Sequence, residues 1–111
     1  MSIDTKTASP KSDAVRFLEA LAGGPLTLGG LLQAIREGEE ASQADFARQL
    51  GISRSHLCDI ERGRKAVSVE RAVRFARTLG YSESQFVRLA LQAMVEEADL
   101  PFRVELAPLT S

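Results

Sequence analysis

The sequence predicts an all-α domain of five to six helices, with one short β-strand near its C-terminus. Apolar residues recur at helical spacing along most of the chain, a serine or threonine stands before each of these stretches, and glycines follow several of them. At 111 residues we expect a single domain with a modest core. Its helical part would span residues 12–98, after a disordered lead-in over residues 1–11. A strand and tail would follow over residues 99–111.

Two helices are expected before the centre of the chain. The first runs from residue 12 to about residue 22, stops at Gly23-Gly24-Pro25, and turns inward Val15, Phe17, Leu18 and Leu21. The second begins after an N-cap at Thr27 and runs from Leu28 to about Glu37, with an apolar stripe of Leu28, Leu31, Leu32 and Ile35. Its Gly29-Gly30 pair lowers the intrinsic stability of the helix and so suggests close packing against another backbone.

Residues 42–63 predict two short helices joined by a tight turn. Ser42 caps the first helix, with Asp45 three residues later, and Gly51 ends it in the left-handed conformation. Ile52 can fill the angle between the helices. Ser53 then caps a second helix that runs to about Arg62 and ends at Gly63.

The second of these helices has an apolar and a polar side. Leu57 and Ile60 lie three residues apart and must face the first helix. The open side then carries Arg54, Ser55, Asp59 and Arg62. Such side chains can bond base edges, and the positive end of the helix dipole favours a phosphate. The alternative is a pair of amphipathic helices in an ordinary bundle, which leaves the polar side without a purpose.

This stretch resembles the Cro/C1-type (Xre) family of helix-turn-helix DNA-binding domains. The matching positions are Ser42-Gln43, Ala47, Leu50-Gly51-Ile52-Ser53 and Ile60-Glu61-Arg62-Gly63. The resemblance extends to the flanking helices, over roughly residues 27–95. It implies a lambda-repressor-like fold and double-stranded DNA as a partner.

The resemblance also implies roles for individual residues. Arg54 and Ser55 would read bases, and Asp59 would accept from a cytosine amine or else support Arg54 or Arg62. An ion pair between Arg36 and Glu61 would tie the preceding helix to the recognition helix. The side chains expected near DNA phosphates are Gln43, Ser53, His56, Arg62, Arg64 and Lys65.

The distribution of charge is compatible with a polyanionic partner, although the net charge is −1 and the pI about 5.8. Eight basic and four acidic residues lie between Gln43 and Arg77, an excess of four positive charges, so the rest of the chain carries five negative charges. A basic motif in an acidic surround can bind phosphates locally while steering DNA less from a distance. The alternative for any one of these arginines is an ordinary solvated surface.

Two more helices are expected after the motif. The first follows an N-cap at Ser68, runs through Leu79, turns Arg71, Arg74 and Arg77 outward, and buries Val69, Ala72, Val73 and Ala76. Gly80 ends it. Ser82 and Gln85 form a capping box for the last helix, whose apolar residues cover more than one face. One face therefore belongs to the core and the other requires a partner.

A short strand is expected after Leu100-Pro101, because Phe102 to Leu106 alternate between apolar and polar residues. A lone strand needs a neighbour, so it would pair with its twin in a homodimer or with another protein by β-augmentation. The alternative is a loose tail whose alternation is accidental. The residues expected at a dimer or partner interface are Phe86, Leu91, Val95, Phe102, Val104 and Leu106.

No catalytic, metal or cofactor site is expected. His56 is the single histidine, and Cys58, two residues later, points to another side of the helix and is expected to be a partly buried thiol. Neither a glycine-rich phosphate loop nor a nucleophile elbow occurs. One cysteine, no signal segment and no membrane-length apolar run indicate a cytoplasmic protein that does not enter membranes.

These features predict a small repressor that binds a short palindromic operator as a homodimer, with half-sites about 34–36 Å apart. A first alternative is an antitoxin that binds a toxin protein and represses its own operon. A second is a scaffold that has kept the fold and binds only protein.

Overall fold

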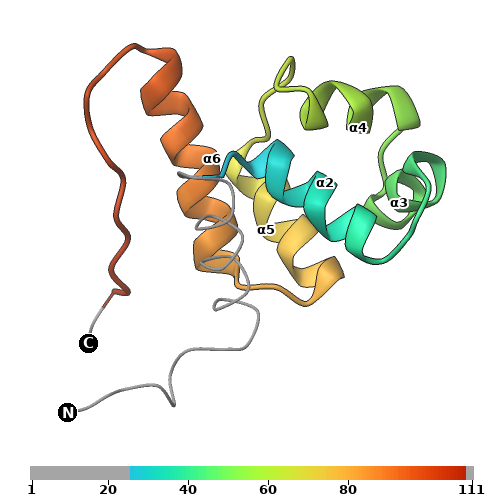
Figure 1. Ribbon diagram of the computed structural model, residues 1–111. Coiled ribbons are helices and arrows are strands. Elements are labelled where there is room, and N and C mark those ends of the chain that lie inside the picture. The colour runs from blue at the N-terminus through green and yellow to red at the C-terminus, as the bar shows by residue number, and fades with distance from the viewer. Residues whose placement is uncertain (1–25, 110–111) are drawn as a thin grey trace.

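The computed structural model of the chain describes residues 26–109, which contain five α-helices and no strand (Figure 1). The helices are α2 (Leu28–Gly38), α3 (Gln43–Leu50), α4 (Arg54–Glu61), α5 (Val69–Leu79) and α6 (Glu83–Glu97). The predicted all-α class is confirmed. The helix expected over residues 12–22 lies outside the described residues. None of the helices within residues 26–109 is long and apolar enough to cross a membrane.

Each of the five helices begins at a hydroxyl N-cap, as the sequence predicts. The side-chain oxygen accepts the backbone N–H three residues on in every case, with distances from 2.9 Å at Thr27 to 3.3 Å at Ser82. The other three caps are Ser42, Ser53 and Ser68. The expected capping box at Ser82 is only half formed. The side-chain oxygen of Gln85, which would accept from the Ser82 backbone N–H in such a box, accepts from the Arg88 guanidinium.

Left-handed glycines end α3 and α5. Gly51 and Gly80 both have φ of +77°, a conformation that a side chain disfavours. After α3, the Ile52 N–H donates to the carbonyl of Ala47 at 3.0 Å, which closes the turn. Ile52 is half-buried and packs against the core between α3 and α4, where the sequence places it.

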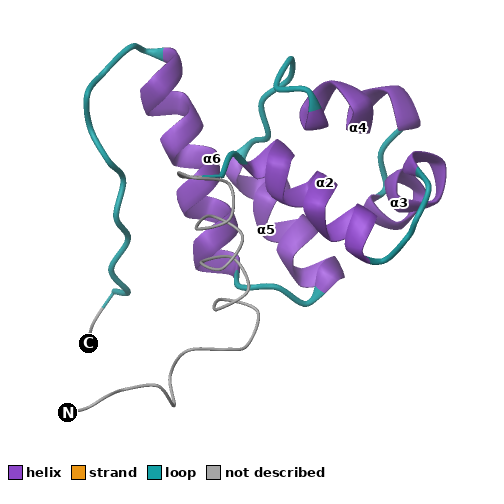
Figure 2. Cartoon of the chain, viewed as in Figure 1, coloured by secondary structure: helices purple, strands orange, loops and turns teal. Residues whose placement is uncertain are grey.

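The core lies where all five helices meet. α5 and α6 form the most extensive interface, α2 packs on both α4 and α6, and α3 packs on α4 and α5 (Figure 2). The largest fully buried side chains are Phe46, Phe75, Phe86, Leu31, Leu32, Leu57 and Ile60. Burying such aliphatic and aromatic groups stabilises the fold by about 1.5–3 kcal/mol each.

The buried side of α5 differs from the predicted one. Val69 and Val73 are only half-buried, while Phe75 and Leu79 are buried beside Ala72 and Ala76. The two residues missing from the prediction complete an i, i+3, i+4, i+7 stripe that begins at Ala72. Val69 lies in the first turn of α5 and packs against the edge of the core.

Two predictions about the C-terminal part are wrong. In the single chain residues 102–106 form no strand, because no second strand exists within the described residues and a helix side chain bonds their backbone instead. Phe86 cannot contact a partner, because it is fully buried in the core, with its ring centroid 6.0 Å from that of Tyr81. The other expected interface residues, Leu91, Val95, Phe102, Val104 and Leu106, are half-buried or exposed.

Candidate nucleic-acid interface

α3, its turn and α4 form the predicted helix-turn-helix (Figure 2). Polar residues are exposed along the outer side of α4. Leu57 and Ile60 are buried against the rest of the domain, as expected. The eight-residue helix places Arg54 and Ser55 at its exposed N-terminal end, where its unbonded backbone N–H groups also lie. The sequence therefore correctly predicted which side of α4 faces the core and which side is exposed.

The first turn of α2 holds the far end of α4 by a close backbone approach. A Cβ atom on Gly29 would overlap the carbonyl oxygen of Ile60 and would crowd the backbone of Glu61. Only glycine fits between the two helices at this point. The close packing suggested by the Gly29-Gly30 pair is confirmed at Gly29. At Gly30 a Cβ would meet only side-chain atoms, with Thr27 Oγ1 at 3.2 Å.

A buried carboxylate joins α2, α3 and α4. Arg36 donates from Nε to Glu61 Oε2 at 2.8 Å and from Nη2 to Glu61 Oε1 at 3.1 Å, and Gln43 Nε2 donates to the same Oε1 at 3.0 Å. The Glu61 side chain is 3% exposed and that of Arg36 is 14% exposed. The hydrogen bond from Glu61 raises the pKa of Arg36 above its ordinary value, although burial works against it. The ion pair implied by the family resemblance is confirmed.

The bonds of Arg36 and Gln43 bear on the roles expected for α3. Arg36 Nη1 also donates to the carbonyl of Ala41 at 3.1 Å, which anchors the loop before α3. Gln43, expected near a phosphate, uses one of its amide hydrogens on Glu61 and is half-buried. The second amide hydrogen remains available for a phosphate.

Three basic side chains around α4 have no partner among the described residues. Arg54, Arg62 and Lys65 are exposed, and none of their side chains forms a hydrogen bond or ion pair with residues 26–109. Arg54 stands at the start of α4, while the other two stand at and beyond its end. Unpaired guanidinium and ammonium groups can bond phosphates, and a guanidinium can also bond guanine at two atoms.

Asp59 pairs with Arg64 and not with the residues that the sequence suggested. Arg64 donates from Nε and Nη2 to Asp59 Oδ1 at 3.1 and 3.0 Å, and its backbone N–H donates to the Asp59 carbonyl at 2.8 Å. The loop after Gly63 folds back over the end of α4 to allow this. The expected support of Arg54 or Arg62 is therefore absent among the described contacts of Asp59.

Arg71 of α5 belongs to the same surface and was not among the expected site residues. Its Nη1 lies 3.4 Å from Nε2 of His56 in α4. Partial burial lowers the pKa of His56 below its ordinary value, and the cations Arg71 and Lys65 lower it further. Burial and these cations favour the neutral imidazole, while the nearby Asp59 carboxylate acts in the opposite sense. In the sequence, the outward position of Arg71, one turn after the Ser68 cap, was the feature that could have placed it on this surface.

Two further expectations concern Ser53 and Cys58. The Ser53 hydroxyl caps α4 through the His56 N–H at 3.0 Å and lies 3.4 Å from the Ser55 hydroxyl, so it remains next to the helix end that would face a phosphate. Cys58 is a free, half-buried thiol, as predicted.

Over residues 26–109 no group of histidine, cysteine or carboxylate side chains is arranged to hold a metal ion.

The comparison with protein families agrees with this geometry. A family model described as a helix-turn-helix domain matches residues 27–89, more than half of the chain. No curated protein sequence matches. Among solved structures, a candidate antidote protein of a plasmid maintenance system from Nostoc punctiforme PCC 73102 is 28% identical, with a TM-score of 0.49 over 68% of this chain and 91% of that one.

Proposed function

The chain belongs to the helix-turn-helix domain family, and from this premise we propose that it is a sequence-specific DNA-binding regulator that places α4 in the major groove. In the finer form of the proposal it is a repressor that occupies a short palindromic operator as a homodimer. A DNA interface supported by one short helix is small, and a second copy doubles the number of bases read.

The observation that carries the proposal is the unpaired basic set around α4, namely Arg54, Arg62 and Lys65. Folding leaves these cations without carboxylate partners in the described part of the chain. The nearby carboxylate of Glu61, at the end of α4, is already bonded to Arg36 and Gln43. We assign base reading to Arg54 and Ser55. We assign phosphate contacts to Arg62, Lys65 and, after exchange of its carboxylate partner, Arg64.

Fluorescence anisotropy across a salt series tests the proposal. The purified chain is titrated with a labelled duplex from upstream of its own gene and with a scrambled duplex of the same composition. We expect tight binding to the first alone, with an affinity that falls steeply as salt increases. Equal, weak binding to both duplexes would contradict sequence-specific recognition.

A matched pair of variants separates local contacts from net charge. Arg62→Ala should reduce the salt slope by about one phosphate contact. Arg77→Ala makes the same charge change in the last turn of α5. Arg77 pairs there with Glu83 at 2.7 Å, so this variant should leave the slope unchanged. Equal effects of both variants would point to a general charge effect and against a contact made by Arg62.

An antitoxin is the second candidate. The observation that favours it is the exposure of large apolar residues at and beyond the end of α6, including Met94, Leu100 and Phe102, which a partner protein could cover. Co-expression with the product of the neighbouring gene, followed by co-purification through a tag on one of them, tests this candidate. Absence of a complex would leave the plain repressor.

A further inference from the structure

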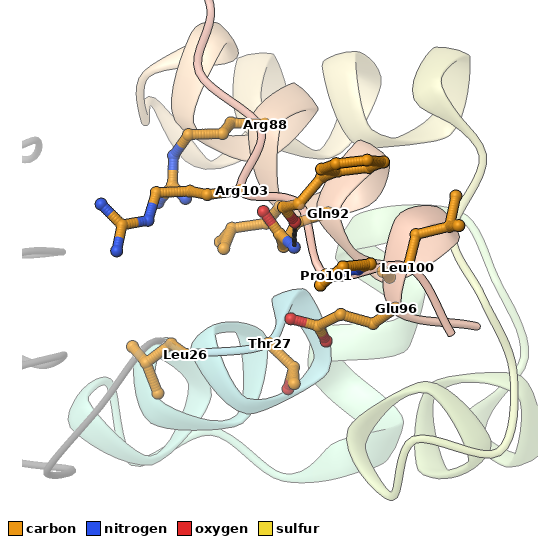
Figure 3. A pocket seen from close by; sticks show the side chains of 11 residues that line it. Leu26, Thr27, Arg88, Gln92, Glu96, Leu100, Pro101 and Arg103 are labelled. Atoms are coloured by element: carbon orange, nitrogen blue, oxygen red, sulfur yellow. Dashed lines mark hydrogen bonds between the residues drawn. The ribbon is translucent and has the colours of Figure 1, made fainter. Parts of the chain in front are cut away.

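The segment after α6 is held along one edge by a single side chain. Gln92 of α6 donates from Nε2 to the carbonyl of Phe102 at 3.0 Å, and its Oε1 accepts from the N–H of Val104 at 2.7 Å. Figure 3 shows Gln92 in the cavity of about 590 Å³ that this segment forms with α6 and the start of α2. A residue of a parallel strand bonds its neighbour in the same pattern, so Gln92 takes the place of a strand.

The opposite edge of the segment is open. In extended backbone, successive residues point their N–H and C=O groups to alternate edges, so Arg103 and Glu105 direct theirs away from Gln92. Neither backbone forms a hydrogen bond with residues 26–109. Pro101 and Pro108 lack an N–H and therefore limit the stretch that can pair fully. This short open edge is a place for one further strand.

We propose that the open edge pairs with the same edge of a second copy of this chain, as an antiparallel ribbon centred on Val104. The proposal rests on the homodimer of the proposed function and assigns its interface, although the pairing itself does not require DNA. In this register Val104 lies opposite Val104 of the second copy. Arg103 and Glu105 then lie opposite each other across the ribbon and exchange both of their backbone hydrogen bonds.

The side chains of the segment are self-complementary in this register. Each Arg103 faces Glu105 of the second copy, so both cross-strand charge pairs are attractive. On the other face, each Phe102 lies opposite Leu106 of the second copy. These two side chains are 63% and 42% exposed in the single chain, and the ribbon would cover them. This charge complementarity identifies a second copy as the occupant.

α6 would contribute further surface beside the ribbon. A two-stranded ribbon alone is marginally stable in water, so the dimer needs apolar contacts as well. Leu91 and Val95 are half-buried and lie one residue before and three residues after Gln92 on α6. In Figure 1 the C-terminal segment runs along the side of the molecule away from α4, so this dimer leaves the recognition helix free.

Charge reversal tests the register. Sedimentation velocity of the full chain without DNA gives the dimer dissociation constant. Arg103→Glu places two carboxylates opposite each other, and Glu105→Arg places two guanidinium groups opposite each other. Each single variant should raise the dissociation constant by about tenfold, and the double variant should return it close to the original value. Arg74→Glu, an exposed reversal on α5, serves as the control and should have no effect.

Cysteine cross-linking tests the centre of the ribbon. In a Cys58→Ala background, Val104→Cys places two thiols at a non-hydrogen-bonded pair, where Cα atoms about 4.5 Å apart permit a disulfide. Mild oxidation should give a covalent dimer, whereas Arg103→Cys, which faces Glu105, should give little.

Three results would overturn the proposal. These are a chain that stays monomeric at all concentrations, a dimer indifferent to both single reversals, and cross-linking at position 103 equal to that at position 104. Because DNA is absent from both measurements, a failure here is distinct from a failure of operator binding.

Discussion

The two sides of α4 differ in how fully their groups are already bonded. On the inner side Leu57 and Ile60 are buried, and the Glu61 carboxylate accepts three hydrogen bonds from Arg36 and Gln43. On the outer side Arg54 and Arg62 are exposed, and their guanidinium groups have no partner within residues 26–109. The difference teaches that the fold fixes the position of this helix through one side and leaves the donors of the other side for a ligand.

The largest effect is expected at the closest contact of the inner side. Gly29→Ala introduces a Cβ that overlaps the Ile60 carbonyl, so α2 and α4 must separate, and the free energy of unfolding should fall by about 3 kcal/mol or more. Urea unfolding followed by circular dichroism measures this. Gly38→Ala is the control, because a Cβ there meets no atom within 4 Å. Equal stability of the two variants would show that the close approach is not a constraint.

The next effect concerns the buried ion pair. Arg36→Ala leaves Glu61 with Gln43 as its remaining side-chain donor, and should lower the free energy of unfolding by about 2–3 kcal/mol. Arg48→Ala, which breaks the exposed pair with Asp45, should cost less than about 1 kcal/mol. Thermal unfolding of both variants measures these two losses of stability. A cost for Arg36→Ala no larger than for Arg48→Ala would remove the distinction between the two sides.

On the outer side, Arg54→Ala should change DNA recognition and leave folding intact. Because its side chain has no partner in the described residues, the unfolding midpoint should stay within error of the parent. Discrimination between operator and scrambled duplex should fall by about 2 kcal/mol, the loss of one bidentate base contact. Competition anisotropy measures it. Equal weakening on both duplexes would instead assign Arg54 to a phosphate.

The smallest expected effect is a pH dependence at the border of the two sides. The folded pKa of His56 is lowered by burial and by Arg71 and Lys65. The unfolded chain therefore binds a proton more readily than the folded protein. The free energy contributed by this group is present above the unfolded pKa of about 6.5 and is lost as pH falls from there through the lower folded pKa.

Urea unfolding between pH 8 and pH 5 checks this for the parent and for His56→Gln. The parent should lose more stability than the variant as the pH falls. Parallel pH profiles of the two proteins would assign the acid sensitivity to other groups.

Sequence reasoning succeeded where the controlling interaction is local. The hydroxyl N-caps and the left-handed glycines Gly51 and Gly80 act within a few residues, so their pattern alone predicted the helix limits. The close contact of Gly29 was also indicated by its sequence. The pairing of Arg36 with Glu61, 25 residues apart, came from the family resemblance and not from spacing.

It failed where a distant group decides. The alternation of Phe102 to Leu106 predicted a strand, but it could not reveal that a glutamine on α6 bonds one edge of this segment. The partner of Asp59 depends on how the loop after Gly63 folds back, which no periodicity encodes. Phe86 was assigned to an interface because α6 is apolar on several sides, and the pattern alone does not say which side the core takes.

The pair of Asp59 and Arg64 has a kinetic consequence for a protein that searches along DNA. The aspartate acts as a built-in counterion, so a random phosphate must displace it before Arg64 can form a new bond. In the proposed function, binding to unrelated sequence would thereby be weakened, and each unproductive encounter would end sooner. At the operator, the base contacts assigned to Arg54 and Ser55 would hold the helix long enough for the exchange to be completed. Asp59 would thus trade some total affinity for a faster search.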